Sequence, residues 1–282
     1  MKITILVDNT ALFDRMFVAE HGFSAYIEAD GKKILFDTGY SDAFLNNAGK
    51  MKIDLLDLDY IILSHGHFDH TGGLWHLIHR LMEAAIEDTP CRLPRLIAHP
   101  RCFHPRPKQQ LFDIGAVLSA EEVQRALPVE LSAEPVKLAP GLFFLGEIDR
   151  KYPFETADPG PRRILLPDGS MQDDLLLDDT ALAFHGRDGL VIITGCAHAG
   201  VCNTIDYAKK VCGENRIQDI IGGFHLRTSG PQLDGTISYF RDLKPAALHA
   251  CHCTSLGAKI ALSKVAPLEE TGVGLQLEYS DL

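Results

Sequence analysis

Three histidines and one aspartate, His65, His67, Asp69 and His70, fall within six residues. They follow the apolar run 60–63, which is typical of a buried strand. Buried polar side chains need partners, and four of them crowded at one strand end would otherwise repel one another or stay unsatisfied. A divalent cation meets that need, because imidazole and carboxylate suit zinc, iron or manganese. The segment therefore predicts a metal site.

The spacing of these side chains favours two ions. In an extended chain His65 and His67 point to the same side and can bind one ion. Asp69 and His70 follow across a turn and can reach a second ion. A pair of ions can activate water as a nucleophile and polarise a substrate oxygen. The alternative is a core histidine cluster without metal, which would leave these polar groups poorly satisfied.

The pattern His-x-His-x-Asp-His after a strand resembles the ligand motif of the metallo-β-lactamase superfamily. A strand followed by Asp-x-Gly at 34–39 precedes the motif, as in that superfamily. Further blocks resemble the branch that includes the archaeal 7,8-dihydropterin-6-yl-methyl-4-(β-D-ribofuranosyl)aminobenzene 5′-phosphate synthases. They lie at 21–24, 146–148, 194–200, 222–226 and 252–254, so the resemblance covers nearly the whole chain.

The expected elements alternate between strands and helices. Apolar runs predict strands at 3–7, 23–28, 33–36, 60–63, 96–98, 181–184, 190–194, 217–221 and 246–249. Helical spacing predicts helices at 41–50, 74–86, 203–211 and 236–243. This order fits two sheets packed face to face with helices outside. The resemblance implies the same α/β architecture, a four-layer αββα sandwich of mixed sheets with the metals at one edge.

We expect a single domain over residues 1–282. The segment 88–110 interrupts the regular pattern with five prolines around one short strand, and we interpret it as a loop-rich insertion. The helix at 74–86 carries His76 and His79, which we expect either on the surface or behind the ligands, but not among the ligands.

The resemblance also implies a later ligand, a bridging acid and a final histidine. His252 follows the strand at 246–249 and is the expected final histidine. The bridging aspartate usual at the end of the strand at 190–194 is replaced here by Gly-Cys-Ala-His. We interpret His198 as a ligand and Cys196 as a neighbour that packs beside it. The bridging role stays open between four residues, Cys196, Asp178, Asp179 and Glu147.

Other side chains are expected to support the metals or the substrate. Asp37 is expected to accept a hydrogen bond from a ligand histidine and fix its tautomer. Asp69 is expected to serve catalysis as well as metal binding. His225 lies in a glycine-rich turn and is expected to contact substrate or donate a proton, and His21 has a weaker case for the same role.

Composition narrows the partners. The net charge is −11 and the isoelectric point about 5.6, which disfavours nucleic acid as a partner. The sequence still allows a locally positive cleft, because Arg95, Arg101, Arg106 and Lys108 share one segment. No apolar stretch has the length to cross a bilayer. Seven cysteines without disulfide-like spacing, and a short apolar start, predict a cytoplasmic protein. The oligomeric state is not determined by the sequence.

These observations predict a metal-dependent hydrolase that acts on a small-molecule substrate, such as a phosphoester or lactone. Two transition-metal ions are expected, with zinc first and iron or manganese as alternatives. Of these substrate classes, the phosphoester would be a phosphorylated molecule. One alternative is a transferase like the pterin synthases, in which the metals hold a phosphate leaving group. A second alternative is a metal-containing ligand sensor without catalysis, because one fold hosts many functions.

Overall fold

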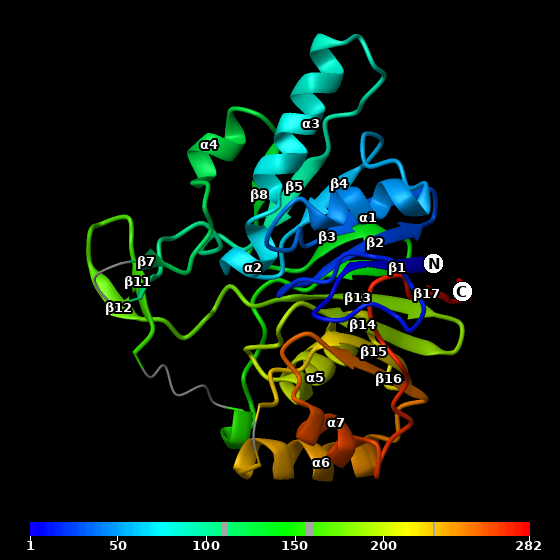
Figure 1. Cartoon of the computed structure of the whole chain (residues 1–282). Helices are drawn as coiled ribbons and strands as arrows, with labels where there is room; N and C mark the ends of the chain where they lie inside the picture. Colours follow the sequence, from blue (N-terminus) through cyan, green and yellow to red (C-terminus); the bar gives the residue numbers. More distant parts are fainter. Residues whose placement is uncertain (109–111, 156–160, 228) are drawn as a thin grey trace.

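The computed structural model describes residues 1–108, 112–155, 161–227 and 229–282. Among these residues, six strands from the first half and one from the C-terminal end build a seven-stranded sheet (Figure 1). The strands β17, β1, β2 and β3 pair antiparallel, and β3, β4, β5 and β8 pair parallel. In sheet order they are β17 Gln276–Glu278, β1 Lys2–Val7, β2 Ser24–Ala29, β3 Lys32–Phe36, β4 Tyr60–Ile62, β5 Arg95–Ala98 and β8 Val129–Leu131.

The second half of the chain supplies most of a six-stranded sheet. Its strands β16, β15 and β14 pair parallel, and β14, β13, β10 and β9 pair antiparallel. In sheet order they are β16 Ala247–Cys251, β15 Ile217–Gly223, β14 Gly189–Thr194, β13 Ala181–Gly186, β10 Leu142–Phe144 and β9 Val136–Ala139.

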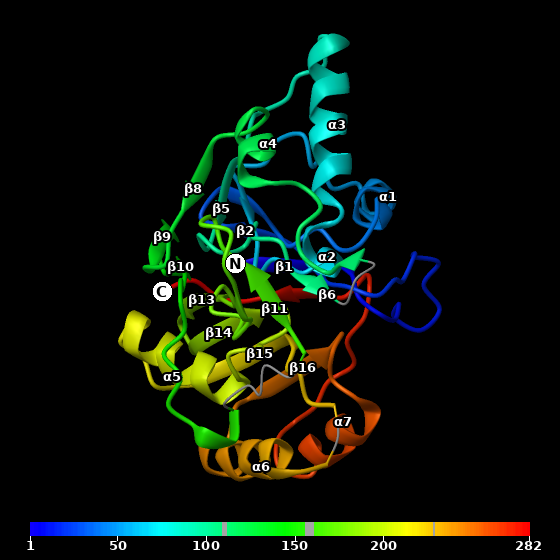
Figure 2. The same cartoon turned by 90° about the vertical axis from the view of Figure 1, so that its left-hand side faces the viewer.

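The two sheets pack face to face, and helices cover both outer faces. The helices α1 Ala43–Met51 and α3 Leu74–Ile86 lie outside the first sheet, and α5 Val201–Cys212, α6 Pro231–Leu243 and α7 Leu256–Leu262 lie outside the second. Figure 2 shows α3 and α6 at opposite ends of the stack. The fold is therefore the four-layer αββα sandwich predicted from the sequence.

Three layers of apolar side chains hold the sandwich together. One lies between the sheets and includes Ile27, Phe36 and Ile193. A second joins the first sheet to α1 and α3, and a third joins the second sheet to α5, α6 and α7. The inner face of α3 uses Leu74, Leu77, Ile78, Leu81 and Ala84, which are spaced three or four residues apart.

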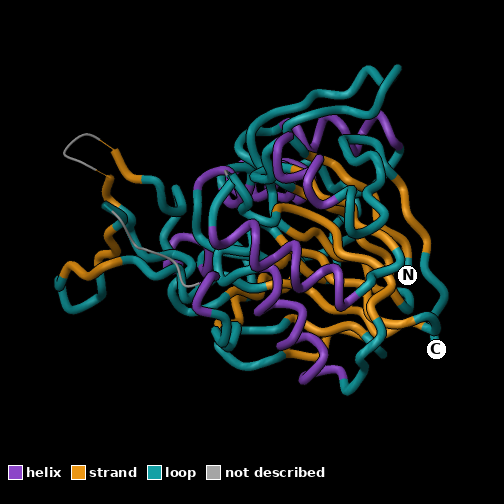
Figure 3. Tube along the Cα trace, turned by 90° about the horizontal axis from the view of Figure 1, so that it is seen from below, coloured by secondary structure: helices purple, strands orange, loops and turns teal. Residues whose placement is uncertain are grey.

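Several short elements lie outside the main layers. The hairpins β6 Pro107–Lys108 with β7 Phe112–Asp113, and β11 Arg163–Leu165 with β12 Met171–Asp173, extend to one side of the sandwich (Figure 3). The short helices are α2 Phe68–Thr71, α4 Ala120–Gln124 and the 3-10 turn η1 Pro153–Glu155. No helix within the described ranges combines the length and apolarity that a membrane crossing requires.

The segment 88–110 does more than form a loop. Its strand β5 lies inside the seven-stranded sheet, between β4 and β8, and Leu96, Ile97 and Ala98 are buried there. Pro94 and Pro100 flank this strand, and Pro107 is the first residue of β6. Residues 109 and 110 of the expected insertion lie outside the described residues.

Candidate metal centre

The ends of five strands converge at one edge of the sandwich. Asp37 follows β3, and the segment from His65 to His70 follows β4, which is parallel to β3. In the second sheet, Cys196 and His198 follow β14, His225 follows β15 and His252 follows β16, and these three strands are parallel. Because parallel strands end at the same edge of a sheet, both sheets direct these residues to one place.

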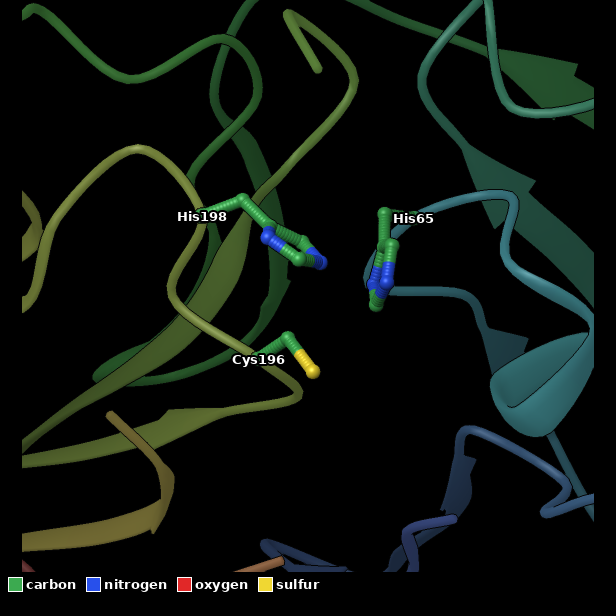
Figure 4. Close-up of side chains that lie close together, drawn as sticks. All are labelled: His65, Cys196 and His198. Carbon is green, nitrogen blue, oxygen red and sulfur yellow. The ribbon is translucent and has the colours of Figure 1, made fainter. Parts of the chain in front are cut away.

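One group of ligand atoms forms around His65. Its Nε2 lies 2.9 Å from Nδ1 of His67, and the ring of His198 lies 4.8 Å from the ring of His65, centre to centre. The Sγ of Cys196 points into the same space (Figure 4). Ligand atoms of His65, Cys196 and His198 all lie within 4.8 Å of one another. The backbone thus brings together residues more than 120 positions apart.

A second group forms around His70. Its Nε2 lies 3.3 Å from Nε2 of His252 and 3.4 Å from Sγ of Cys196. The carboxylate of Asp69 lies 3.5 Å from His252 Nε2 and 3.1 Å from Nε2 of His21. The six residues predicted as ligands are therefore all present in these two groups, and His21 joins the second.

The chemistry of these atoms fits metal ions. Nitrogen atoms face nitrogen atoms at short distance in both groups, and Nε2 of His198 is buried with no hydrogen-bond partner among the described residues. A bound cation would satisfy these atoms. Both groups combine imidazole with either a thiol or a carboxylate, which suits divalent transition metals.

Electrostatics keeps most of these histidines neutral and ready to bind. Burial lowers the pKa of His65 and of His198 well below the ordinary value for imidazole. Burial and the nearby Arg106 lower the pKa of His67 to about 3. His70 differs, because Asp69 and Asp37 outweigh its burial and raise its pKa to about 9. Loss of this proton would free His70 Nε2 for a metal ion.

Asp37 holds the second group in place, as predicted. Its Oδ2 accepts hydrogen bonds from His70 Nδ1 at 2.7 Å and from Ser64 Oγ at 2.6 Å, and its Oδ1 accepts one from the Ser64 backbone N–H at 2.7 Å. Ser64 Oγ in turn lies 2.9 Å from Nδ1 of His65. One buried carboxylate therefore orients one histidine of each group.

Asp37→Ala should weaken metal binding about 10- to 100-fold, because the ring of His70 loses the acceptor that fixes its tautomer and direction. Competition with a chromophoric chelator would measure the affinity. Asp37→Asn is the matched control, since its amide oxygen can still accept one of these hydrogen bonds, and its loss should be smaller. An unchanged affinity in Asp37→Ala would contradict the supporting role.

The four candidates for the bridging position lie in different places. Asp178 accepts hydrogen bonds from the Gly66 backbone N–H at 2.8 Å and pairs with Arg106. Asp179 accepts from the Ala199 backbone N–H at 2.8 Å, and burial raises its pKa to about 7. Glu147 lies 3.2 Å from His99 and lines a separate cavity of about 640 Å³. Only the fourth candidate, Cys196, shares ligand groups with the histidines among the described residues.

The geometry therefore favours the alternative for Cys196 that the sequence left open. The sequence predicts that its side chain packs beside His198, whereas its Sγ belongs to both histidine groups. Gly195 explains the direction. Any side chain at 195 would collide with Ser64 Oγ and Asp37 Oδ2, so residue 196 is the first position after β14 that can present a ligand.

Of the cations expected to form a positive cleft at 95–108, Arg106 does not line one. Its side chain is 1 % exposed and pairs with Asp174 at 2.9 Å and Asp178 at 2.6 Å. It lies beneath the His65–His67 segment, where Gly66 has no room for a side chain because Arg106 and the Cys102 carbonyl fill that space. Arg106 is therefore a structural cation. Arg95 pairs with Glu130 at the surface, and Lys108 lines the cavity beside the two candidate ligand groups.

That cavity has a volume of about 350 Å³ and opens directly onto both ligand groups. Its lining combines apolar side chains with three cations, so an anionic group could bind there although the chain as a whole is acidic. The lining residues include His21, His67, Phe68, Asp69, Lys108, Ile114, Arg162, Cys196, His198, His225, Arg227, His252 and Cys253.

His225 lies where a substrate contact would be expected. Its ring is 4.2 Å from that of His198, and its Nδ1 has no hydrogen-bond partner among the described residues. Its backbone has a φ of 50°, and its N–H donates to Sγ of Cys253 at 3.2 Å. This left-handed turn brings the imidazole to the cavity.

Sequence analysis missed the residues that support His252. Asp8 accepts a hydrogen bond from the His252 backbone N–H at 2.8 Å, and Asn9 Oδ1 lies 2.9 Å from its Nδ1. Both follow β1, in the same way that Asp37 follows β3. A polar pair directly after a buried strand was the available signal. Arg162 and Arg227 were also missed, because nothing near them in the sequence marks a site.

Comparison with known proteins identifies relatives of this chain. The model of the metallo-beta-lactamase superfamily matches residues 18–87. The 7,8-dihydropterin-6-methyl-4-(β-D-ribofuranosyl)-aminobenzene-5′-phosphate synthase of Methanocaldococcus jannaschii is 32% identical over 276 residues, which cover 92% of this chain and 89% of that protein. An uncharacterized protein of the same organism is 32% identical over 93% of this chain and 94% of its own length.

A solved structure, Tm1679, is described as a metal-dependent hydrolase of the beta-lactamase superfamily. It is 29% identical, and the two chains cover each other completely with a TM-score of 0.82. Together, the strand order, the ligand groups and these similarities show that the chain belongs to the metallo-β-lactamase superfamily, in the branch that includes the Methanocaldococcus jannaschii synthase.

Proposed function

We propose that this chain is a metal-dependent hydrolase with a dinuclear site, and that its substrate is a small phosphorylated molecule. The observation that carries the proposal is the pair of ligand groups that meet at Cys196 beside a cation-lined cavity. His65, His67 and His198 would hold one ion, and Asp69, His70 and His252 the other. Bound there, two ions would lower the pKa of a water molecule and polarise a phosphoryl or carbonyl oxygen.

The chain's own residues would position the substrate. Lys108, Arg162 and Arg227 line the cavity and would bind its anionic group. Phe68 and Ile114 line the same cavity and would contact an apolar part of the molecule. The volume of about 350 Å³ suits a small ligand and lies within the range of such sites.

Two histidines flank the ligand groups and could move protons. His225 lines the cavity and has a buried nitrogen available for a hydrogen bond to the leaving group. His21 is hydrogen-bonded to Asp69, and this carboxylate raises its pKa even though burial opposes the shift. Each could donate a proton to a departing oxygen.

A second candidate is a synthase-like transferase, because the Methanocaldococcus jannaschii relative is named as a synthase. In this case the cationic side chains of the cavity and the two metal ions would bind a phosphate leaving group. A ribofuranosylaminobenzene 5′-phosphate would be the acceptor. The two candidates share the metal site and differ in whether water or an organic nucleophile reacts.

Metal-replete protein should contain about two transition-metal ions per chain and should hydrolyse bis(p-nitrophenyl) phosphate or a related phosphoester. Elemental analysis and a colorimetric assay would measure both quantities. His67→Ala should lose about one ion, whereas His76→Ala, a control at an exposed histidine of α3, should retain both.

The outcomes separate the candidates. A firm value of one ion, unchanged after zinc, iron or manganese is added, would contradict the dinuclear site. The transferase would be favoured by a protein that binds two metal ions, shows no hydrolysis and co-purifies with a pterin. On mixing, it should join this pterin to the ribofuranosylaminobenzene 5′-phosphate. Two ions, tight ligand retention and no turnover would indicate a sensor.

A further inference from the structure

Cys196 occupies the position that both ligand groups share. Its Sγ lies within 4.8 Å of ligand atoms of His65 and His198, and within the same distance of those of His70 and His252. The contact with His70 Nε2 is 3.4 Å. The side chain is 4 % exposed and lines the cavity of about 350 Å³.

The backbone around Cys196 fixes this placement. Gly195 fits against Ser64 and Asp37 only because it has no side chain, and Ala197 adopts a left-handed φ of 47°. Cys196 and His198 therefore both face the site on either side of this turn (Figure 4). Among the described residues, the nearby carboxylates of Asp178 and Asp179 belong to neither ligand group, and each uses its Oδ2 for other partners. Asp178 binds Arg106 and Gly66, and Asp179 binds the Ala199 backbone.

We propose that Cys196 is the ligand shared by the two ions, with its Sγ as a bridging thiolate. The inference rests on the proposed dinuclear site. On metal binding the S–H bond would break, the proton would leave to solvent, and Cys196 would supply the sulfur electron pairs to hold the ions. A thiolate is a soft ligand, so this site should prefer zinc, or iron, over manganese.

Cys253 is the second thiol near the site and provides the matched control. Its Sγ lies near Cys196 and His225 and accepts a hydrogen bond from the His225 backbone N–H. Gly223 gives it room, because a side chain there would meet this sulfur. The His65 and His70 groups, however, contain Cys196 and not Cys253. A bridging role for Cys196 therefore predicts different results for the two cysteines.

X-ray absorption of the zinc-loaded, full-length protein would count the sulfur neighbours of zinc, which lie at about 2.3 Å when bound. With two ions per chain, a bridging Cys196 gives about one sulfur per zinc, whereas a terminal thiolate gives about half. Cys253→Ser should leave the value near one. Cys196→Ser should remove the sulfur signal and, in cobalt-loaded protein, the near-ultraviolet thiolate-to-metal band.

Several results would overturn the inference. They are two bound zinc ions without a sulfur neighbour, a value near half in the wild type, or a signal lost in Cys253→Ser and kept in Cys196→Ser. The wild-type measurement stands even if Cys196→Ser fails to fold. None of these readouts depends on turnover, so the bridging role of Cys196 can be wrong while the proposed dinuclear enzyme is right. A count of one zinc ion per chain would instead contradict the proposed function.

Discussion

Asp69→Ala should lower turnover by about three orders of magnitude, equivalent to about 4 kcal/mol of activation free energy, while the protein stays folded. The carboxylate lies 3.5 Å from His252 Nε2 and 3.8 Å from His70 Nε2, so its loss removes the only acidic ligand proposed for the second ion. The apolar layers of the sandwich do not include it. We therefore expect metal content to fall from about two ions to about one.

Elemental analysis, turnover and thermal unfolding on the same preparation would test this expectation. Asp42→Ala is the matched control, because Asp42 is exposed before α1 and its side chain makes no capping hydrogen bond. The control should keep both ions and full turnover. An Asp69→Ala protein with normal metal content and near-normal turnover would contradict its role as a ligand.

The part of the site contained in one segment was predictable from the sequence. His65, His67, Asp69 and His70 lie close together in the chain, and the apolar run before them fixes them at a strand end. Asp37 could be assigned for the same reason, since it follows a strand that is parallel to β4. Local spacing is sufficient to predict a site when its residues share one segment or lie at the ends of neighbouring strands.

The position of Cys196 depends on contacts that no local pattern contains. The direction of its side chain depends on Gly195 fitting against Ser64 and Asp37, which come from the other sheet. A sequence shows a cysteine two residues before a histidine, and either residue could be the one that points inward. The bridging carboxylates stayed open for the same reason, because their partners Arg106 and the Ala199 backbone are distant in sequence.

Helix boundaries show a smaller limit of the same kind. The last long helix was expected at 236–243, whereas α6 begins at Pro231 after Gly230. Proline is favoured in the first turn of a helix, because its missing N–H would have no partner there. The sequence contains this start signal at Pro231, but the first turn has few apolar residues, so the helical spacing becomes visible only later. Leu233 packs in the layer under α6, so tertiary burial adds this turn to the helix.

Arg106→Met should lower the free energy of unfolding by about 3–5 kcal/mol, because it leaves two buried carboxylates without their cation. Asp174 and Asp178 are 2 % and 1 % exposed and lie within 2.9 Å of the guanidinium. Denaturant unfolding of the metal-free protein would measure the change without a contribution from bound ions. Arg95→Met is the matched control at an exposed pair with Glu130, and it should cost about 1 kcal/mol or less.

Removal of the Arg106 cation should also disturb the candidate metal site, because Asp178 accepts a hydrogen bond from the backbone N–H of Gly66, between His65 and His67. Adding Asp174→Asn to Arg106→Met should recover part of the stability, since one of the two buried charges is then removed. Recovery in the double variant would identify unpaired charge as the cause, whereas its absence would point to lost packing. If Arg106→Met unfolded within about 1 kcal/mol of the wild type, Arg106 would have no structural role beneath the histidine segment.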